Sequence, residues 1–417
     1  MNSFVSLLMW SNLIHQVTAS GDAGASHRQG WTESPNTRGT IDIIWTCLFT
    51  LSICCWTVVH LDITHNDPQI KEAWWRRPCA RTLCVLIAIF APEALVATAL
   101  LDMLQARATT PCQELLDNGW THRHGLYLLM GGFSVTITPP DNRPVKIFYS
   151  KSLQRLNELV TGNIVHAPTT TEEEICDKSK SDPFLKLVAL LQVAWLLVQC
   201  IARTAQGLPI TTLEISTLSD LPSTFAAYIL WWNKPYDVAI PTQLKLLDNA
   251  FSTNTEEKIY SYGSDRLNRT FHTPWRIAGL FFDIFEMNDD HLSKYRIFAF
   301  IISSVSLVFG GVHCIAWNYS FPSHWEQIAW RICSIVVGGS VPLSFGLSYI
   351  VTRFDNISRS EGQEAVFLCL WSAIVLIPFL LYLLARFFLL FEILYELRSL
   401  PSGCYQTVDW WAFFPHV

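Results

Sequence analysis

Acidic residues inside strongly apolar stretches are the first residues of this chain whose type and position suggest chemistry. Glu93 lies in the middle of "IAIFAPEALVATAL", directly after Pro92. Proline removes a backbone hydrogen-bond donor, so we expect a helix through this stretch to kink and to open a local space. A carboxyl group in such an apolar setting favours its neutral, protonated form. Glu93 is therefore either a packing acid that is hydrogen-bonded to a neighbouring helix or a proton donor.

A second pair of acids lies in "QGLPITTLEISTLSD". Glu214 falls about one turn inside the helix that Thr211 or Thr212 is expected to cap, where the helix dipole favours an acid. This position indicates a capping role for Glu214. Asp220 lies six residues deeper and has no capping explanation. We therefore rank Asp220 beside Glu93 as a candidate proton donor.

A histidine in "FGGVHCIAWN" is a candidate proton acceptor. His313 and Trp317 are four residues apart and share one helix face. His313 is either a hydrogen-bonded packing residue or a base. The preceding Gly310 and Gly311 are expected to let a neighbouring helix pack closely.

The segment "FPSHWEQIAWRICSIV" adds an acid, an aromatic residue and a cation. Glu326 and Trp330 are four residues apart, and Glu326 is a further candidate acceptor. Arg331 is expected to reach the membrane interface, to pair with an acid, or to hold a polar or anionic head group. Farther on, a charge-paired helix end at the interface is predicted from Arg386, Glu392, Glu396 and Arg398.

The composition indicates a membrane protein. Half of the 417 residues are hydrophobic and only 15% are charged, whereas about a quarter of a soluble domain is charged. The net charge of −6 comes without a basic block, so no nucleic-acid partner is indicated. The chain has no GxGxxG, Walker A, HExxH or CxxC motif. We therefore expect no cofactor and no metal.

The elements that must position these residues are apolar stretches long enough to cross a bilayer, at about 20 residues each. We predict an all-α, polytopic transmembrane helical bundle of about seven spans with two long polar loops, 105–183 and 233–294. The predicted spans are 41–61, 82–104, 184–205, 212–232, 295–317, 328–351 and 365–391.

The remaining segments complete the predicted organisation. Residues 1–19 are either a signal peptide or an interfacial helix, residues 20–40 an exposed connector, and residues 41–417 a single integral membrane domain. The first polar loop contains "HGLYLLMGGFSVTITPP", which is expected to be a re-entrant or interfacial piece. Cys112 and Cys176 bracket that loop and could form a disulfide in an oxidising compartment.

The loop 62–81 carries Lys71, Arg76, Arg77 and Arg81, so the positive-inside rule places it in the cytosol. Seven spans then put the N-terminus in the lumen and the C-terminus in the cytosol. The expected location is the endoplasmic reticulum or another endomembrane. The same topology predicts lumenal glycosylation at Asn268 and Asn356.

Several blocks of the chain resemble a large group of fungal polytopic membrane proteins. They are "IFAPE", "LYLLMGGF", "KSKSDPFLKLVALLQVAWLLVQCIARTAQGLPITTLE", "WWNKPYDV" and "LARFFLLFEILYELRSLP". That group includes the membrane-bound terpene cyclases of the ascofuranone and macrophorin (meroterpenoid) type. The resemblance implies closure of the farnesyl tail of a prenylated aromatic or quinone-like core. The resemblance identifies no catalytic residues, so the candidate site residues are inferred from their types and positions in the sequence alone.

A protonation-triggered cyclase needs one acid, an apolar cavity and π-faces that steady carbocations. Glu93 or Asp220 would donate the proton, and His313, Glu326 or water would remove the last one. The implied partners are a lipophilic prenylated substrate, the bilayer and other enzymes of the pathway. Candidate substrate-binding residues are Trp195, Trp231, Trp232, Trp317, Trp330 and Arg331.

A different class of function uses the same residues. In a transporter or exporter of a lipophilic metabolite, or in a membrane scaffold, the buried acids would couple protons or pack helices. An enclosed aromatic cavity at Glu93 or Asp220 would favour cyclisation. A path open to both sides would favour transport, and a solid core would favour a scaffold.

Overall fold

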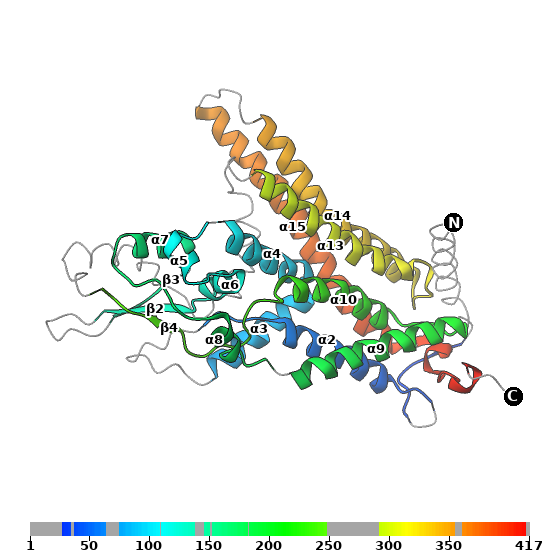
Figure 1. Cartoon of the computed structure of the whole chain (residues 1–417). Coiled ribbons are helices and arrows are strands. Elements are labelled where there is room, and N and C mark those ends of the chain that lie inside the picture. The colour runs from blue at the N-terminus through cyan, green and yellow to red at the C-terminus, as the bar shows by residue number, and fades with distance from the viewer. Residues whose placement is uncertain are drawn as a thin grey trace, which may run out of the picture.

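The fold comes from a computed structural model, in which the described residues are 27–34, 37–63, 75–108, 110–137, 146–150, 152–181, 183–247, 292–354 and 361–413. The chain is mostly helical and has two parts: a long helical bundle, and a polar lobe at one end of it made by residues 110–181 and 233–247 (Figure 1). We call the opposite end of the bundle the far end.

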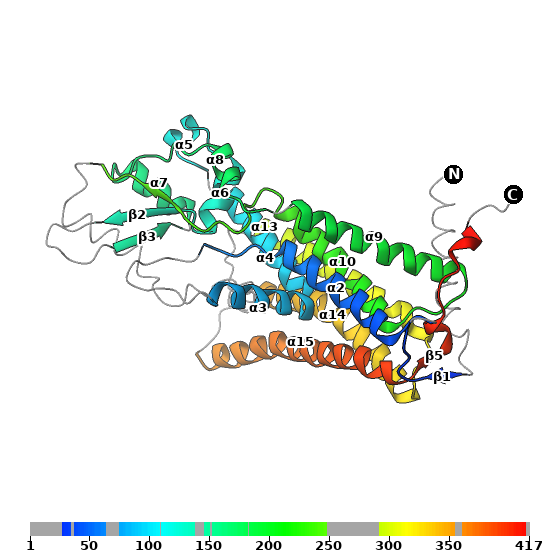
Figure 2. The same ribbon diagram turned by 90° about the horizontal axis from the view of Figure 1, so that it is seen from below.

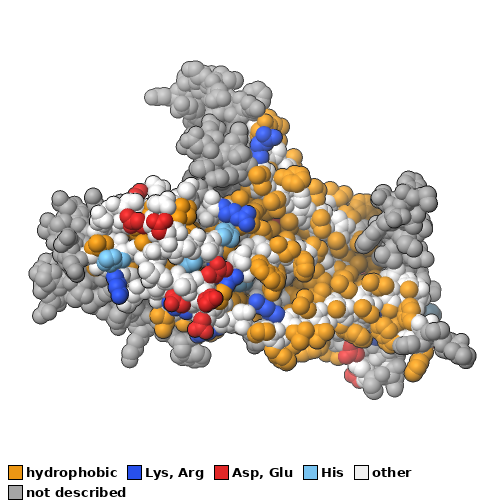
Figure 3. Space-filling view, in the orientation of Figure 1, with side chains coloured by type: hydrophobic (Ala, Val, Ile, Leu, Met, Phe, Trp, Pro, Cys, Tyr) orange, Lys and Arg blue, Asp and Glu red, His pale blue; other side chains and the backbone are white. Residues whose placement is uncertain are grey.

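Long helices run side by side between the polar lobe and the far end (Figure 2). Within the described residues, five helices are long and apolar enough to cross a membrane. Hydrophobic side chains cover the bundle face in Figure 3, whereas acidic and basic side chains gather over the polar lobe. The five are α2 (Thr40–Val58), α9 (Pro183–Ala205), α13 (Leu292–His313), α14 (His324–Phe354) and α15 (Glu361–Tyr395).

The predicted span 212–232 forms α10 (Thr212–Leu230), a helix that lies inside the bundle. It packs against α2, α4 and α13. Its buried residues include Glu214, Asp220 and many Ser and Thr side chains, so it is less apolar than the other five. It is a core helix whose polar groups face neighbouring helices rather than lipid.

The predicted span 82–104 is not one kinked helix. It forms α3 (Arg76–Phe90) and α4 (Pro92–Ala108), which break at Ala91 and bend by 114°. Proline is well suited to the first helical position, because its missing N–H would have no partner there. The sequence thus predicted the position of the break correctly, but the observed bend is larger than the predicted kink.

Both ends of this bent pair touch the polar lobe. The Arg77 guanidinium at the start of α3 donates to the Val238 carbonyl at 2.7 Å. Near the end of α4, Ala106 lies against Gly125, where an added Cβ would be only 3.2 Å from Ala106. The α3–α4 pair therefore enters the bundle from the lobe and returns to it.

The first polar loop is folded, which corrects the prediction of an all-α chain with two long loops. Strands β2 (Phe133–Ile137), β3 (Lys146–Ser150) and β4 (Thr242–Leu244) form a sheet in the order β3-β2-β4. β2 pairs antiparallel with β3 and parallel with β4. Short helices complete the lobe: α5 (Gln113–Asp117), α6 (His122–Leu129), α7 (Leu153–Thr161) and α8 (Glu172–Asp177).

The segment "HGLYLLMGGF" belongs to this lobe and is not a re-entrant membrane piece. α6 ends at Leu129, Gly131 turns the chain with a φ of 87°, and β2 begins at Phe133. That positive φ is open to glycine at no steric cost. Tyr127 and Phe133 are fully buried in the core of the lobe.

At the far end, β1 (Arg28–Gln29) pairs with β5 (Leu400–Pro401). One strand precedes α2 and the other follows α15, so the chain enters and leaves the bundle at the same end. The six helices α2, α9, α10, α13, α14 and α15 pass between the two ends of the bundle, and α3–α4 returns. The predicted seven crossings are not confirmed: the described residues contain five helices long and apolar enough to cross a membrane, or six if the bent α3–α4 pair is counted as one span.

The pairing of β1 with β5 also involves residues 20–40, which were predicted to be an exposed connector. In the described part of that segment, β1 belongs to a sheet and Arg38 is only 7% exposed. Cys112 and Cys176 are free cysteines. The signal peptide or interfacial helix at 1–19 and the sequons at Asn268 and Asn356 lie outside the described residues.

Candidate functional site

A buried polar cluster lies where α3 breaks into α4, and we call it the acid cluster. It brings together side chains from four elements that are far apart in the sequence. Its members are Glu93 from α4, Ser216 and Asp220 from α10, His313 from α13, and Tyr382 and Arg386 from α15. Sequence analysis predicted three of them, namely Glu93, Asp220 and His313.

Glu93 is held in the first turn of α4, where the helix dipole favours an acid. It is 2% exposed, and its Oε2 accepts a hydrogen bond of 2.7 Å from the Tyr382 hydroxyl. Its Oε1 is buried without a hydrogen-bond partner among the described residues. A buried oxygen without a donor is energetically unfavourable and is a common feature of functional sites.

Arg386 caps the helix end at the break beside Glu93. Its guanidinium donates to the carbonyls of Ile89 and Phe90, both at 2.7 Å, at the C-terminal end of α3. These carbonyls have lost their helical partners because the helix stops there. The guanidinium also lies 4.3 Å from the ring centre of Phe309. Arg386 is therefore a buried cap rather than part of the charge-paired helix end that the sequence predicted.

Asp220 is the second buried acid of the cluster, 5% exposed, and its Oδ1 has no hydrogen-bond partner among the described residues. Its carboxyl group interacts electrostatically with both Arg386 and Glu93. Two carboxyl groups thus share one guanidinium that is already engaged with backbone carbonyls. Burying two charged carboxylates under these conditions is unfavourable, so the arrangement suits a cluster that carries an exchangeable proton.

His313 is fully buried beside these acids. Its Nδ1 lies 2.9 Å from the Phe309 carbonyl, and its Nε2 lies 2.9 Å from the Ser216 hydroxyl. A carbonyl only accepts, so Nδ1 carries a hydrogen. In the neutral imidazole, Nε2 then accepts a hydrogen bond from the Ser216 hydroxyl and is the basic nitrogen that faces α10.

Of the aromatic residues predicted to bind substrate, Trp330 lies beside the acid cluster and the others lie elsewhere. The Trp330 ring is fully buried, 5.6 Å from the His313 ring, and its indole N–H donates to the His313 carbonyl. Phe309, which was not predicted, lies 4.7 Å from the His313 ring. These rings supply π-faces next to the acids.

Five predicted site residues lie elsewhere. Glu326 pairs with Arg398 at 2.5 Å, and Arg331 donates to the Trp317 carbonyl and covers its ring. Trp195 is half exposed, and its ring packs at a tilt against that of Trp410 with ring centres 5.5 Å apart. Trp232 is 70% exposed. These residues form the surface of the bundle, so neither Glu326 nor Arg331 joins the acid cluster.

A second buried polar group lies at the lobe end of the bundle, and Trp231 belongs to it. Asp102 of α4 accepts hydrogen bonds from the Lys234 ammonium at 2.7 Å and from the Trp231 indole at 3.0 Å. Lys234 also lies 3.9 Å from Asp62. Sequence analysis missed this group, although an aspartate near the end of an apolar run and a lysine in "WWNKPYD" were the available signals.

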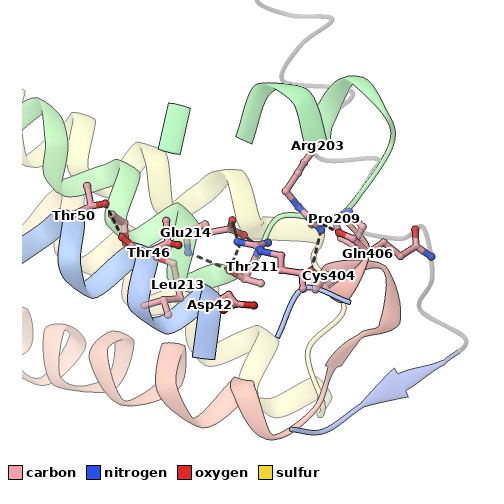
Figure 4. Close-up of polar contacts among 12 residues, drawn as sticks. Asp42, Thr46, Thr50, Arg203, Pro209, Thr211, Leu213, Glu214, Cys404 and Gln406 are labelled. Atoms are coloured by element: carbon pink, nitrogen blue, oxygen red, sulfur yellow. Dashed lines mark hydrogen bonds and ion pairs between the residues drawn. The ribbon is translucent and has the colours of Figure 1, made fainter. Parts of the chain in front are cut away.

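A third group closes the far end of the bundle (Figure 4). Thr211 caps α10 with a capping box formed with Glu214, as the sequence predicted. Glu214 also pairs with Arg38 at 2.5 Å, and both side chains are almost fully buried. Arg203 donates to four carbonyls, those of Pro209, Gly403, Cys404 and Gln406. This group joins α9, α10 and the C-terminal segment, which is a structural role.

Glu396 and Glu392 lie near this end as well. The Thr212 hydroxyl donates to the Glu396 carboxylate. Glu392 is 1% exposed. The described residues contain no group of three or more His, Cys, Asp or Glu side chains arranged to hold a metal ion.

The five long apolar helices and their exposed hydrophobic surface are compatible with an integral membrane protein. The chain belongs to a family of unknown function, DUF8562, whose sequence profile matches residues 7–255 and 291–417. No curated protein matches the chain, and no solved structure matches it.

Proposed function

We propose that this protein is a membrane-bound terpene cyclase that closes the prenyl tail of a meroterpenoid or related isoprenoid by protonation, in an endomembrane such as the endoplasmic reticulum. One observation carries the proposal. Glu93 and Asp220 meet at a helix break inside the bundle, each with one carboxyl oxygen that has no hydrogen-bond donor among the described residues.

The acid cluster contains the groups that such a reaction needs. A protonated carboxyl of Glu93 or Asp220 gives its proton to the terminal alkene, or to an epoxide oxygen whose C–O bond then breaks. The resulting cation is attacked by the next alkene, so one C–C bond forms for each π-bond lost. The rings of Trp330 and Phe309 lie where they can steady a cation.

The final proton leaves a carbon next to the last cation and restores one alkene. The His313 Nε2 lone pair is a suitable acceptor once Ser216 turns its hydroxyl away. A water molecule or the carboxylate itself is the alternative acceptor. The reaction is an isomerisation overall and requires no redox partner.

The test is expression of the full chain with a farnesylated aromatic precursor and analysis of the products. We expect Glu93→Gln or Asp220→Asn to lower cyclisation at least a hundredfold, which is the usual scale for losing a general acid. Glu326→Gln is the matched control, because Glu326 lies at the bundle surface with Arg398. Normal cyclisation by both acid variants would remove these residues from the mechanism, and no cyclic product from wild type would remove the cyclase proposal.

A non-enzymatic carrier or scaffold is the second candidate, and one observation favours it. The acid cluster is packed among buried side chains, and a cavity lined by described residues lies at the lobe end of the bundle. In that case Glu93→Gln would leave the products unchanged and alter either metabolite export or the stability of the bundle. Comparing export from vesicles with product formation distinguishes these functions.

A further inference from the structure

A cavity of about 430 Å³ lies where the polar lobe meets the lobe ends of α9 and α10. Arg123 and Ser179 line it from the lobe, and Lys186, Tyr228 and Trp232 line it from the bundle. None of these residues belongs to the acid cluster. The lining contains cations, hydroxyl groups, an amide and several aromatic rings, but no carboxylate among the described residues.

The cavity lining carries positively charged side chains, and among them Lys186 differs from Arg123 and Lys234 in its partners. Arg123 is balanced by Glu172 at 3.2 Å, and Lys234 is balanced by Asp102 at 2.7 Å. Lys186 makes no ion pair with the described part of the chain. Its ammonium lies 5.6 Å from the ring centre of Tyr228. One positive charge therefore faces the cavity without a balancing acid from the described residues.

The surroundings of Lys186 are apolar on the membrane side. Its neighbours on α9, Phe184 and Leu187, are 72% and 52% exposed. Trp232, 70% exposed, packs edge-on against Tyr228 with ring centres 5.6 Å apart. Tryptophan is typical of membrane interfaces, because its ring is apolar and its indole N–H can form a hydrogen bond with water. The cavity thus joins a polar, positive interior to an apolar outer surface.

We infer that this cavity binds the negatively charged head group of an amphiphile, with the head group at Lys186 and the apolar chain against α9 and α10. Ser179, Ser181 and Asn233 supply further hydrogen-bonding groups in the lining. The chemistry that would be recognised is a carboxylate or phosphate joined to a long hydrocarbon chain.

This chemistry has two sources, an anionic phospholipid of the surrounding bilayer and a prenylated aromatic acid. The second rests on the proposed function. Asp220 and Trp231 are 11 residues apart on and just beyond α10, which is about 16 Å along a helix. An extended chain of three isoprene units can bridge that length from the head group to the acid cluster.

The experiment uses the full chain in nanodiscs of uncharged phosphatidylcholine and calorimetric titration of two probes. A farnesylated hydroxybenzoate is compared with its methyl ester, which lacks the charge. We expect the acid to bind roughly tenfold more tightly than the ester, and Lys186→Gln to abolish that difference. Lys180→Gln is the matched control, because Lys180 is exposed in the same segment and does not line the cavity.

Phosphatidic acid in the nanodisc forms the second arm. Competition with the hydroxybenzoate that depends on Lys186 identifies a lipid head group as an occupant, and its absence identifies the prenylated acid. Equal affinity for acid and ester, or equal loss of affinity in both lysine variants, overturns the site. Glu93→Gln should retain binding whatever its effect on cyclisation, so failure of the cyclase proposal is distinguishable from failure of this site.

Discussion

The buried charged residues of this molecule have different roles, and the role of each depends on the groups that it contacts. Glu214 was predicted to cap α10, and it does so. The sequence could not show that Arg38 would pair with it, because the two residues are separated by 176 positions. In the acid cluster, Glu93, Asp220 and His313 were predictable as ionisable groups in apolar runs. Tyr382 and Arg386 were not, because only the packing of α15 against α3 and α4 brings them there.

The Arg38–Glu214 pair should be much more important for stability than the Glu326–Arg398 pair. The side chains of Arg38 and Glu214 are 6% and 0% exposed, whereas that of Glu326 is 15% exposed and that of Arg398 is 36% exposed. Arg38→Met leaves a buried carboxylate without its cation, so we expect a loss of about 3–5 kcal/mol. Arg398→Met should lose at most about 1 kcal/mol. Thermal unfolding of both variants in detergent measures the difference, and equal midpoints would contradict the assignment.

His60 should make the stability of the lobe end depend on pH. It lies beyond the end of α2, and burial, followed by the charges of Lys234, Lys186 and Arg81, lowers its pKa from 6.5 to about 3. Between these values the unfolded chain binds a proton that the folded chain does not. The free energy of unfolding therefore falls as the pH drops, by about 2 kcal/mol between pH 7 and pH 5.

His60→Gln removes this titration and keeps a side chain that can still donate to the Val58 carbonyl. We expect the unfolding midpoint of the variant to shift less than that of wild type between pH 7 and pH 5. Other titrating groups contribute to both proteins and cancel in the comparison. An unchanged shift would show that His60 is not held neutral in the folded protein.

At the scale of elements, helix positions were predictable and their relations were not. Hydrophobic runs located the long helices, and Pro92 located the break between α3 and α4. At that bend, the free carbonyls of α3 accept hydrogen bonds from Arg386, which lies on a helix nearly 300 residues away in the sequence. In the sheet of the polar lobe, the parallel pairing of β2 with β4 could not be predicted, because β4 lies more than 100 residues later in the chain. Such long-range pairing leaves no local signal.

The two neighbouring glycines of α13 provide a test of helix packing. Both were expected to allow close approach, but only Gly310 does so. A Cβ on Gly310 would lie 2.5 Å from the Gly338 Cα of α14, whereas a Cβ on Gly311 meets nothing within 4 Å. We expect Gly310→Ala to lower stability by about 1–3 kcal/mol through overpacking.

Gly311→Ala is the matched control, and it should be neutral or slightly stabilising because alanine favours a helix. The measurement is the thermal midpoint of each variant in the same detergent. A stable Gly310→Ala variant would mean that α13 and α14 are farther apart than the structure places them.

At the scale of the whole molecule, the pairing of β1 with β5 places the segment before α2 and the segment after α15 at the same end of the bundle. The predicted topology has the segment 82–104 cross the membrane. In the structure, however, both ends of the α3–α4 pair contact the polar lobe. If the bundle crosses the membrane, we expect the segments before α2 and after α15 to lie on one side of it. Arg77 and Arg81 lie with the lobe at the other end, so the positive-inside rule predicts that the lobe end faces the cytosol.

Cysteine labelling in sealed vesicles tests this orientation. Cys79 and Cys176 are exposed at the start of α3 and on α8, so both should react with a membrane-impermeant maleimide from the cytosolic side. Thr407 is exposed at the far end, and Thr407→Cys in a chain with Cys79→Ser and Cys176→Ser should react only from the lumenal side. If Cys79 and Cys176 reacted from opposite sides, α3–α4 would be a true crossing. Labelling of all three positions from one side would mean that the bundle lies along the membrane instead of crossing it, because the two ends of a crossing bundle face different compartments.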